Sequence, residues 1–144
     1  MKEIGAPLAG EMSGHMFFGG DWYGFDDALF GAARLLAYVA REGGPLSRLL
    51  ADLPKTYATA ELRVDCPDDE KFDVVQQAAA EFAAKYTVST LDGVRITFPD
   101  GWGLLRASNT QPVLVMRFEA TSAKARDAYR AEVEGWLAAR GVTA

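Results

Sequence analysis

The sequence predicts an α+β fold: a mainly antiparallel sheet covered on one face by two helices, preceded by a strand–loop–helix segment. Asp92-Gly93 separates two β-prone runs, 87–91 and 94–98, and this dipeptide is typical of a tight hairpin. Apolar residues recur twice at helical spacing in the second part of the chain, over 72–86 and 125–137. Two such helices with hairpin-linked strands are expected to cover one face of a sheet and to leave the other face open.

The first part, residues 1–50, is predicted to contain the end of a strand, a loop and a helix. The strand end is the short apolar segment 6–9. Asp26 and Asp27 suit the positive N-terminal end of a helix, which we expect to end by Gly43-Gly44. The helix is indicated by apolar residues at helical spacing, namely Phe25, Leu29, Ala32, Leu36 and Val39. A shorter apolar segment follows Pro45 and ends at Pro54, and residues 51–55 are our hinge candidate.

The second part, residues 56–144, is predicted to be a complete α+β domain. We expect strands over 57–64, 87–91, 94–98, 103–107 and 112–120. Pro67-Asp68 is predicted to cap the first helix, and the last helix is predicted to be capped near Thr121 or Ser122. The expected apolar face of the first helix is Phe72, Val75, Ala79, Phe82 and Tyr86. That of the last helix is Ala125, Tyr129, Val133, Trp136 and Leu137.

Composition narrows the possible functions. Twenty acidic residues outnumber 15 basic ones, and this balance argues against binding nucleic acid by neutralising phosphates. The single cysteine, Cys66, excludes a disulfide framework within the chain, fits a reducing compartment and suits a small apolar position at a strand end. The longest apolar stretch, 28–40, contains Gly31 and Arg34 and is shorter than the about 20 residues of a membrane-spanning helix. We therefore expect a cytoplasmic protein with neither nucleic-acid nor membrane partners.

Residues 106–112, Arg-Ala-Ser-Asn-Thr-Gln-Pro, combine several anion-binding groups in one short segment. The guanidinium of Arg106 can bind a phosphate through two hydrogen bonds. Ser108 and Thr110 add hydroxyl groups, Asn109 adds an amide, and successive backbone N–H groups in such a turn can surround an anion. The segment therefore indicates a phosphate-binding loop, and the alternative is an ordinary polar turn between two strands.

Residues 10–15, Gly-Glu-Met-Ser-Gly-His, form a second candidate cluster. Its two glycines permit tight turns and close approach of a ligand. Glu11 and Ser13, two residues apart, can hydrogen-bond neighbouring hydroxyl groups of a sugar. His15 is the only histidine of the chain, and imidazole suits proton transfer near neutral pH. The alternative is a glycine-rich surface loop, and no metal-ligand spacing is recognisable.

Together, the two clusters resemble the C-terminal part of the α-D-phosphohexomutases of the bacterial phosphomannomutase/phosphoglucomutase type. Segment 10–15 is similar to the family's sugar-recognition loop, and segment 106–112 to its C-terminal phosphate-binding loop. Two connecting segments also fit, Leu-Pro-Lys-Thr-Tyr at 53–57 and Phe-Pro-Asp-Gly-Trp-Gly at 98–103. Asn109 stands where phosphoglucosamine mutases usually carry glycine. The resemblance implies a C-terminal domain similar in fold to the TATA-box-binding protein.

In the resembled enzymes, hexose 1-phosphate and 6-phosphate are interconverted through a bisphosphate that turns around in the site. The resemblance implies that Glu11 and Ser13 hold the O3 and O4 hydroxyls, which glucose and mannose share. It implies that Arg106, Ser108, Asn109 and Thr110 hold the phosphate that is not reacting. His15 becomes the candidate general acid or base.

The resemblance further implies a fragment: residues 1–50 as the end of a third, sugar-binding α/β domain, and 56–144 as a complete fourth domain. Nothing in the sequence is similar to the family's phosphoserine loop or its Asp-rich magnesium loop. We therefore expect no cofactor here, Mg²⁺ in the full-length enzyme through residues absent from this chain, and no turnover by the fragment alone. Two alternatives stay open: a stand-alone phosphosugar-binding module, and an interaction domain that uses its open sheet face.

Overall fold

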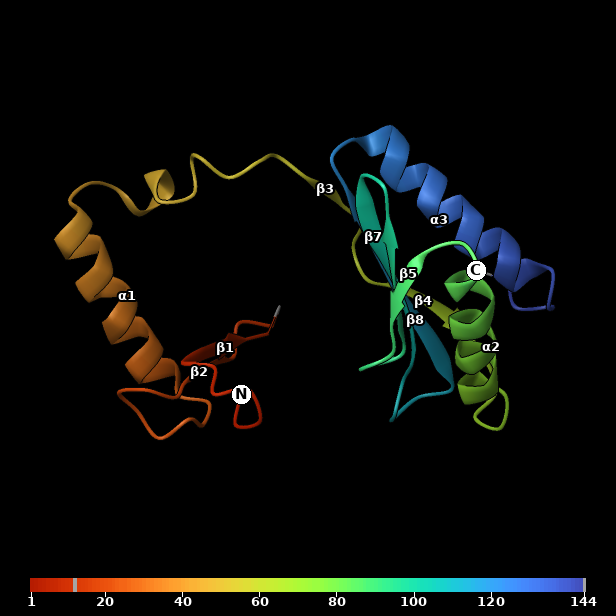
Figure 1. The fold of residues 1–144 in the computed structure, drawn as a ribbon, viewed down its shortest axis with the longest axis horizontal. Coiled ribbons are helices and arrows are strands. Elements are labelled where there is room, and N and C mark those ends of the chain that lie inside the picture. The colour runs from red at the N-terminus through yellow and green to blue at the C-terminus, as the bar shows by residue number, and fades with distance from the viewer. Residues whose placement is uncertain (12, 144) are drawn as a thin grey trace. The chain divides into compact units, whose positions relative to one another are not determined.

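The computed structural model describes residues 1–11 and 13–143. The chain forms two compact units, Met1–Leu53 and Pro54–Ala144 (Figure 1). We call them the N-terminal and the C-terminal unit and describe each by itself.

The N-terminal unit contains strands β1 (Leu8–Gly10) and β2 (Met16–Phe18), helix α1 (Ala28–Glu42) and the short 3₁₀ helix η1 (Leu46–Arg48). The two strands pair antiparallel, with Leu8 opposite Phe18. The prediction of one strand end in this part was therefore incomplete. Strand β2 was missed because three residues, Met-Phe-Phe, are too few to show alternation.

Helix α1 begins and ends where the sequence indicated. The Asp27 side chain caps its N-terminus by accepting a hydrogen bond from the Phe30 backbone N–H at 2.9 Å. Its C-terminal cap is Gly43, at φ 64°, a backbone conformation that favours glycine. The helix packs on β2 at its buried Gly31, where a Cβ atom would meet Met16 and Phe18. Several large apolar side chains of this unit are nevertheless exposed: Tyr23, Phe25, Leu29, Leu36, Leu50 and Leu53.

The C-terminal unit is built on one antiparallel sheet of six strands. These are β3 (Tyr57–Ala58), β4 (Leu62–Asp65), β5 (Thr87–Ser89), β6 (Val94–Phe98), β7 (Gly101–Ala107) and β8 (Val113–Ala120). Their order is β3-β8-β7-β6-β5, and β4 also pairs with β8. The predicted strand 57–64 is thus interrupted. At the break, the Thr59 hydroxyl accepts a hydrogen bond from the Phe118 N–H at 3.1 Å in place of a backbone carbonyl.

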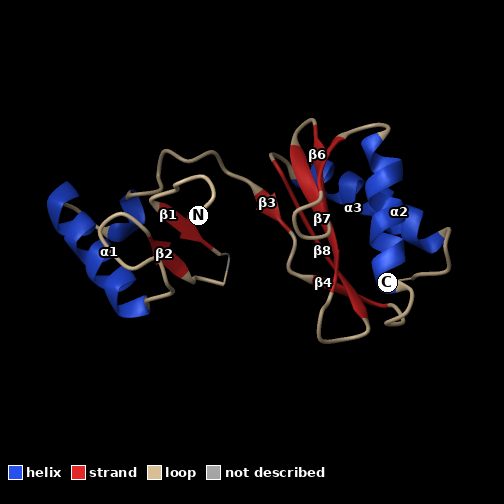
Figure 2. Ribbon diagram, turned by 60° about the horizontal axis from the view of Figure 1, so that its bottom comes forward, coloured by secondary structure: helices blue, strands red, loops and turns tan. Residues whose placement is uncertain are grey.

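Helices α2 (Lys71–Ala83) and α3 (Ala123–Ala138) lie on the same face of this sheet (Figure 2). Between them and the sheet lies one core, which includes Phe82, Ile96, Leu105, Phe118 and Leu137. The opposite sheet face, which we call the open face, is covered by neither helix. Cys66 is buried directly after β4, as expected for a small apolar position.

The predicted apolar face of α2 was wrong at one position. Phe72 is 50% exposed, whereas Val74 and Ala78 are buried. The helix begins at Lys71 and its N-cap is Glu70 rather than Pro67-Asp68. Its buried stripe runs through 71, 74, 75, 78 and 82. Position 72 therefore lies beside this stripe. Within residues 1–11 and 13–143, no helix is long and apolar enough to cross a membrane.

Candidate functional site

The 11–15 loop joins β1 to β2 and is closed by its own backbone. The Glu11 N–H donates to the His15 carbonyl at 2.9 Å, and the Gly14 N–H donates to the Glu11 carbonyl at 3.0 Å. Gly14 has φ 92°, so a side chain at this position would be strained. Met12, part of the predicted motif, lies outside the described residues.

Three predicted residues of this loop are brought together. The Ser13 hydroxyl donates to Oε2 of Glu11 at 3.1 Å and lies 2.9 Å from Nδ1 of His15. The same carboxylate oxygen is 3.4 Å from His15 Nδ1. The side chains of Glu11 and His15 are 58% and 53% exposed, so both can reach a ligand. The cluster offers a hydroxyl, a carboxylate and an imidazole, which can hydrogen-bond a sugar and move a proton.

Asp26 is a fourth member of this cluster that sequence reasoning missed. Its Oδ2 lies 3.8 Å from Nε2 of His15, on the side of the ring opposite Glu11. A bridge between Phe17 and Asp26 brings the segment before α1 against β2. The sequence pattern places Asp26 only at the helix N-terminus, because pairing across this loop leaves no periodic signal.

The 108–112 loop joins β7 to β8 and is organised by Ser108. The Ser108 N–H donates to the Val113 carbonyl at 3.0 Å and closes the loop. The Ser108 hydroxyl is buried and accepts hydrogen bonds from the backbone N–H groups of Thr110, at 3.3 Å, and Gln111, at 3.2 Å. Within the part of the chain that the structure describes, the Asn109 N–H has no hydrogen-bond partner. Asn109 and Thr110 are both exposed.

Two basic residues far away in the sequence hold the end of this loop. The Lys71 ammonium donates to the Gln111 carbonyl at 3.1 Å, and Nη1 of Arg63 donates to the Gln111 side-chain oxygen at 2.6 Å. Lys71 is 3% exposed and also pairs with Asp68. Sequence reasoning missed both contacts because they span 40 and 48 residues.

Arg106 lies at the end of β7 on the open face. Its neighbours Leu105 and Ala107 are buried in the core, and side chains alternate along a strand. Arg106 pairs with Val115 of β8, and Arg117 pairs with Leu104. Arg117 is therefore the diagonal neighbour of Arg106 on the open face; such neighbours are about 7–8 Å apart, and their Cβ atoms are somewhat closer.

Both arginines are partly buried, and neither guanidinium group forms an ion pair or a hydrogen bond within residues 1–11 and 13–143. A guanidinium that is partly removed from water without a counter-charge is costly, so the pair is suited to an anionic ligand. Sequence reasoning missed Arg117. Alternation along 112–120 could have assigned it to the polar face, but its place beside Arg106 depends on the strand register.

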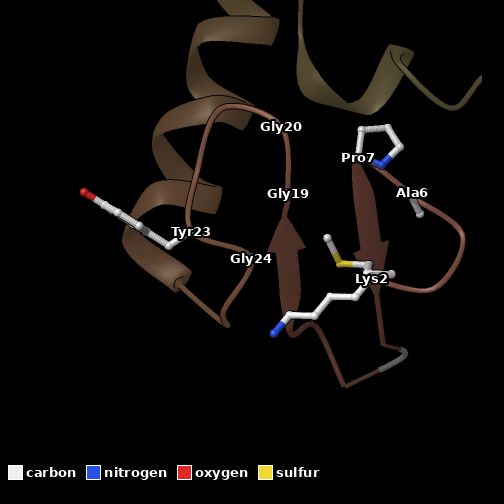
Figure 3. A pocket seen from close by; sticks show the side chains of 9 residues that line it. Lys2, Ala6, Pro7, Gly19, Gly20, Tyr23 and Gly24 are labelled. Atoms are coloured by element: carbon white, nitrogen blue, oxygen red, sulfur yellow. The ribbon is translucent and has the colours of Figure 1, made fainter.

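A pocket of about 250 Å³ beside the 108–112 loop is lined by Asn109, together with Gly93, Ala107 and residues of α2. A pocket of about 320 Å³ at the start of the chain is lined mostly by small residues, together with Lys2 and Tyr23 (Figure 3). None of the predicted site residues lines it. Within the described ranges 1–11 and 13–143, no group of three or more His, Cys, Asp or Glu side chains could hold a metal ion.

Comparison with protein families gives two adjoining matches. Residues 1–57 match the model of phosphoglucomutase/phosphomannomutase, alpha/beta/alpha domain III. Residues 61–135 match the model of the phosphoglucomutase/phosphomannomutase C-terminal domain. The chain belongs to the phosphoglucomutase/phosphomannomutase family. Both loops described above lie within matched segments, the 11–15 loop in the domain III match and the 108–112 loop in the C-terminal match.

Individual family members agree with this membership. The phosphomannomutase/phosphoglucomutase of Pseudomonas aeruginosa PAO1 is 47% identical over 122 residues, which cover 83% of this chain and 26% of that protein. The phosphoglucomutase of Neisseria gonorrhoeae is 48% identical over 123 residues, with the same two coverages. A crystal structure of a family protein from Burkholderia thailandensis matches 96% of this chain and 29% of its own, with a TM-score of 0.80 and 45% identity. The chain thus spans about a quarter of the length of the curated relatives it matches.

Proposed function

We propose that this chain is the substrate-binding C-terminal portion of a phosphohexomutase that interconverts hexose 1-phosphate and 6-phosphate, with glucose or mannose as the sugar. The observation that carries the proposal is the pair of partly buried, unpartnered guanidinium groups of Arg106 and Arg117 beside the preformed 108–112 loop. Arg106 and Arg117 are diagonal neighbours on one sheet face, so a phosphate bound between them would reduce their mutual repulsion.

In this proposal the C-terminal unit holds the phosphate that is not reacting. Arg106 and Arg117 donate charge-assisted hydrogen bonds to the phosphate oxygens. The Asn109 N–H, the Asn109 amide and the Thr110 hydroxyl complete the site from the loop. Ser108 contributes in two ways: its oxygen organises the loop, and its hydroxyl proton can still be donated to the ligand. Such a clamp recognises a phosphate without regard to which sugar carbon carries it, as a bisphosphate that turns around requires.

The 11–15 loop is proposed to hold the sugar. Glu11 accepts hydrogen bonds from two neighbouring hydroxyls, assigned as O3 and O4, and Ser13 supplies a second polar group beside them. His15 lies between Glu11 and Asp26 and acts as the general acid or base at the reacting hydroxyl. Contacts to O3 and O4 do not involve O2, where glucose and mannose differ, so both sugars are accepted.

The remaining parts of the chemistry are proposed to come from other domains of a longer protein. Mg²⁺ neutralises charge during phosphoryl transfer in such enzymes, and the described residues offer no cluster to hold it. The exposed apolar side chains of the N-terminal unit, Leu29 and Leu36 among them, are suited to packing against those domains. We therefore expect no mutase turnover from the 144-residue chain alone. Cys66 is a free thiol, which fits a reducing compartment such as the cytoplasm.

The test is an NMR titration of the 144-residue chain with inorganic phosphate and with glucose 1-phosphate. We expect weak binding, about millimolar, with shifts of Arg106 through Thr110 and of Arg117 that are similar for both ligands. Arg106→Ala should weaken binding at least about tenfold, the equivalent of about 1.4 kcal/mol. Arg126→Gln, which removes the same charge from an ion pair with Asp127 on α3, is the matched control and should change little.

The outcomes separate this proposal from its alternatives. Tight, sugar-dependent binding that also shifts Glu11 through His15 would favour a stand-alone phosphosugar-binding module. Equal losses in Arg106→Ala and Arg126→Gln would mean that only net charge matters and would refute the clamp. No shifts for either ligand would contradict a clamp that is preformed in this chain.

A further inference from the structure

We propose that Lys71 is a positioning residue that holds the 108–112 loop in its phosphate-binding shape through the carbonyl of Gln111. This inference rests on the proposed function, because it concerns the same loop. The buried polar or charged side chains of the described residues are Lys71 and Ser108, and both contact this loop. Ser108 organises the start of the loop, and Lys71 holds its end.

The position of Lys71 is unfavourable by two ordinary criteria. Lysine is among the side chains least often buried, yet this one is 3% exposed. It is also the first residue of α2, where the helix dipole disfavours a positive charge. Such local conflicts are expected where a residue serves a function. The ammonium is paired with Asp68 and also donates to the Gln111 carbonyl, 40 residues away in the sequence, at 3.1 Å.

The contact with Gln111 fixes the groups that face the ligand. The Gln111 carbonyl accepts from Lys71 and from the Val113 N–H at 2.8 Å, which determines the orientation of the peptide group after Gln111. The Gln111 N–H, on the preceding peptide, donates to the Ser108 hydroxyl together with the Thr110 N–H. Holding Gln111 therefore holds the turn that presents Asn109 and Thr110.

The Lys71→Met variant distinguishes a role of Lys71 in positioning the 108–112 loop from a role in stabilising the fold. The substitution leaves no buried polar group without a partner, because Gln111 keeps the Val113 N–H and the Asp68 side chain is 71% exposed. Removing one partner of an ion pair is destabilising when it leaves the other charge buried. Asp68 is exposed, so this cost does not arise, and the cost of burying the ammonium is removed. We expect the melting temperature to stay unchanged or to rise while phosphate affinity falls about tenfold. The Thr110 and Gln111 amide protons should exchange faster with solvent in the absence of phosphate.

The experiment measures affinity for inorganic phosphate, melting temperature and amide hydrogen exchange on the 144-residue chain. Lys85→Met, which removes a 69% exposed lysine paired with Glu132, is the matched control. A parallel loss of stability and affinity would mean a merely structural role. A loss of affinity with unchanged amide exchange would mean that Lys71 acts by charge alone. Unchanged affinity would also overturn the inference.

Two further measurements keep the result interpretable. If Arg106→Ala does not weaken phosphate binding, the proposed clamp fails; if it does and Lys71→Met does not, only the Lys71 inference fails. If Lys71→Met does not fold, the wild-type chain still provides a test. Coupling is reciprocal, so phosphate must strengthen the Lys71–Gln111 contact as much as that contact strengthens phosphate binding. Phosphate should therefore slow exchange of the Lys71 ammonium protons, and an unchanged rate would overturn the inference.

Discussion

Replacement of Gly93 by alanine should damage both the fold and the phosphate clamp. Gly93 has φ 73°, in the left-handed region, and lies in the turn between β5 and β6. A Cβ atom at this position would lie 2.5 Å from the Arg106 Cβ and 2.5 Å from the Leu105 carbonyl oxygen. Both neighbours belong to β7, whose register is set by pairing along both of its edges, so neither can move without disturbing the sheet.

The expected magnitude has two parts. A non-glycine residue in the left-handed region costs about 1–2 kcal/mol. Forcing extra atoms into a packed site costs typically about 1–3 kcal/mol. Gly93→Ala should therefore lower the free energy of unfolding by about 2–5 kcal/mol, and the melting temperature by at least about 8 °C for a domain of 60–100 residues. Displacement of Arg106 should also weaken phosphate binding about tenfold or more, because a charge-assisted hydrogen bond contributes about 1.5–3 kcal/mol.

The assay is urea unfolding and thermal melting of the 144-residue chain, followed by phosphate titration under conditions where the variant is folded. Gly135→Ala is the matched control. Gly135 lies inside α3, and a Cβ atom there would meet nothing within 4 Å. The control should be more stable than wild type by about 0.5–1 kcal/mol, because alanine loses less backbone entropy in a helix. If Gly93→Ala were as stable as wild type, or bound phosphate equally well, the close contact with Arg106 would be refuted.

Three further predictions concern the C-terminal unit. Arg117→Gln should weaken phosphate binding about tenfold, measured by calorimetry or NMR. The control Arg126→Gln should bind phosphate as tightly as wild type. If Arg117→Gln also binds as tightly as wild type, Arg117 is not part of the clamp. The hydrogen bond from the Trp136 indole, together with Arg140, lowers the pKa of Glu81 below its usual value of 4.5. The stability that ionised Glu81 contributes is therefore fully present above pH 4.5 and is lost as the pH falls through the lower, folded-state pKa. Urea unfolding should therefore show Glu81→Gln less stable than wild type near neutral pH and the difference shrinking in acid; a difference independent of pH would contradict this. Burial, with the hydrogen bond to Glu132, raises the pKa of Tyr86 above 10.0, so stability should fall as pH rises from 10.0 through that higher value. Thermal melts of Tyr86→Phe should lose this alkaline dependence, whereas retention of it would assign the titration to another group.

Several elements of both units could be predicted because their signals are local. The Gly93 turn between β5 and β6, the Ser122 cap of α3 and the glycine end of α1 depend on backbone conformations that a few neighbouring residues decide. The strand predicted over 87–91 nevertheless ends at Ser89, so the connection is longer than the predicted tight turn. The predictions failed where the signal was short or depended on partners. Strand β2 has three residues, and the break between β3 and β4 depends on a hydrogen bond between Thr59 and Phe118, 59 residues apart.

The candidate site likewise has features that could be predicted from the sequence and features that could not. The sequence by itself determined the α+β class, the two loops and their family, because glycine positions and runs of anion-binding residue types are legible within six or seven neighbouring residues. Only the tertiary structure decided that Arg117 lies beside Arg106, that Asp26 approaches His15 and that buried Lys71 holds Gln111. These contacts arise from strand register and helix docking. Both are determined by the summed burial of a shared core, so no single segment of the chain carries the information.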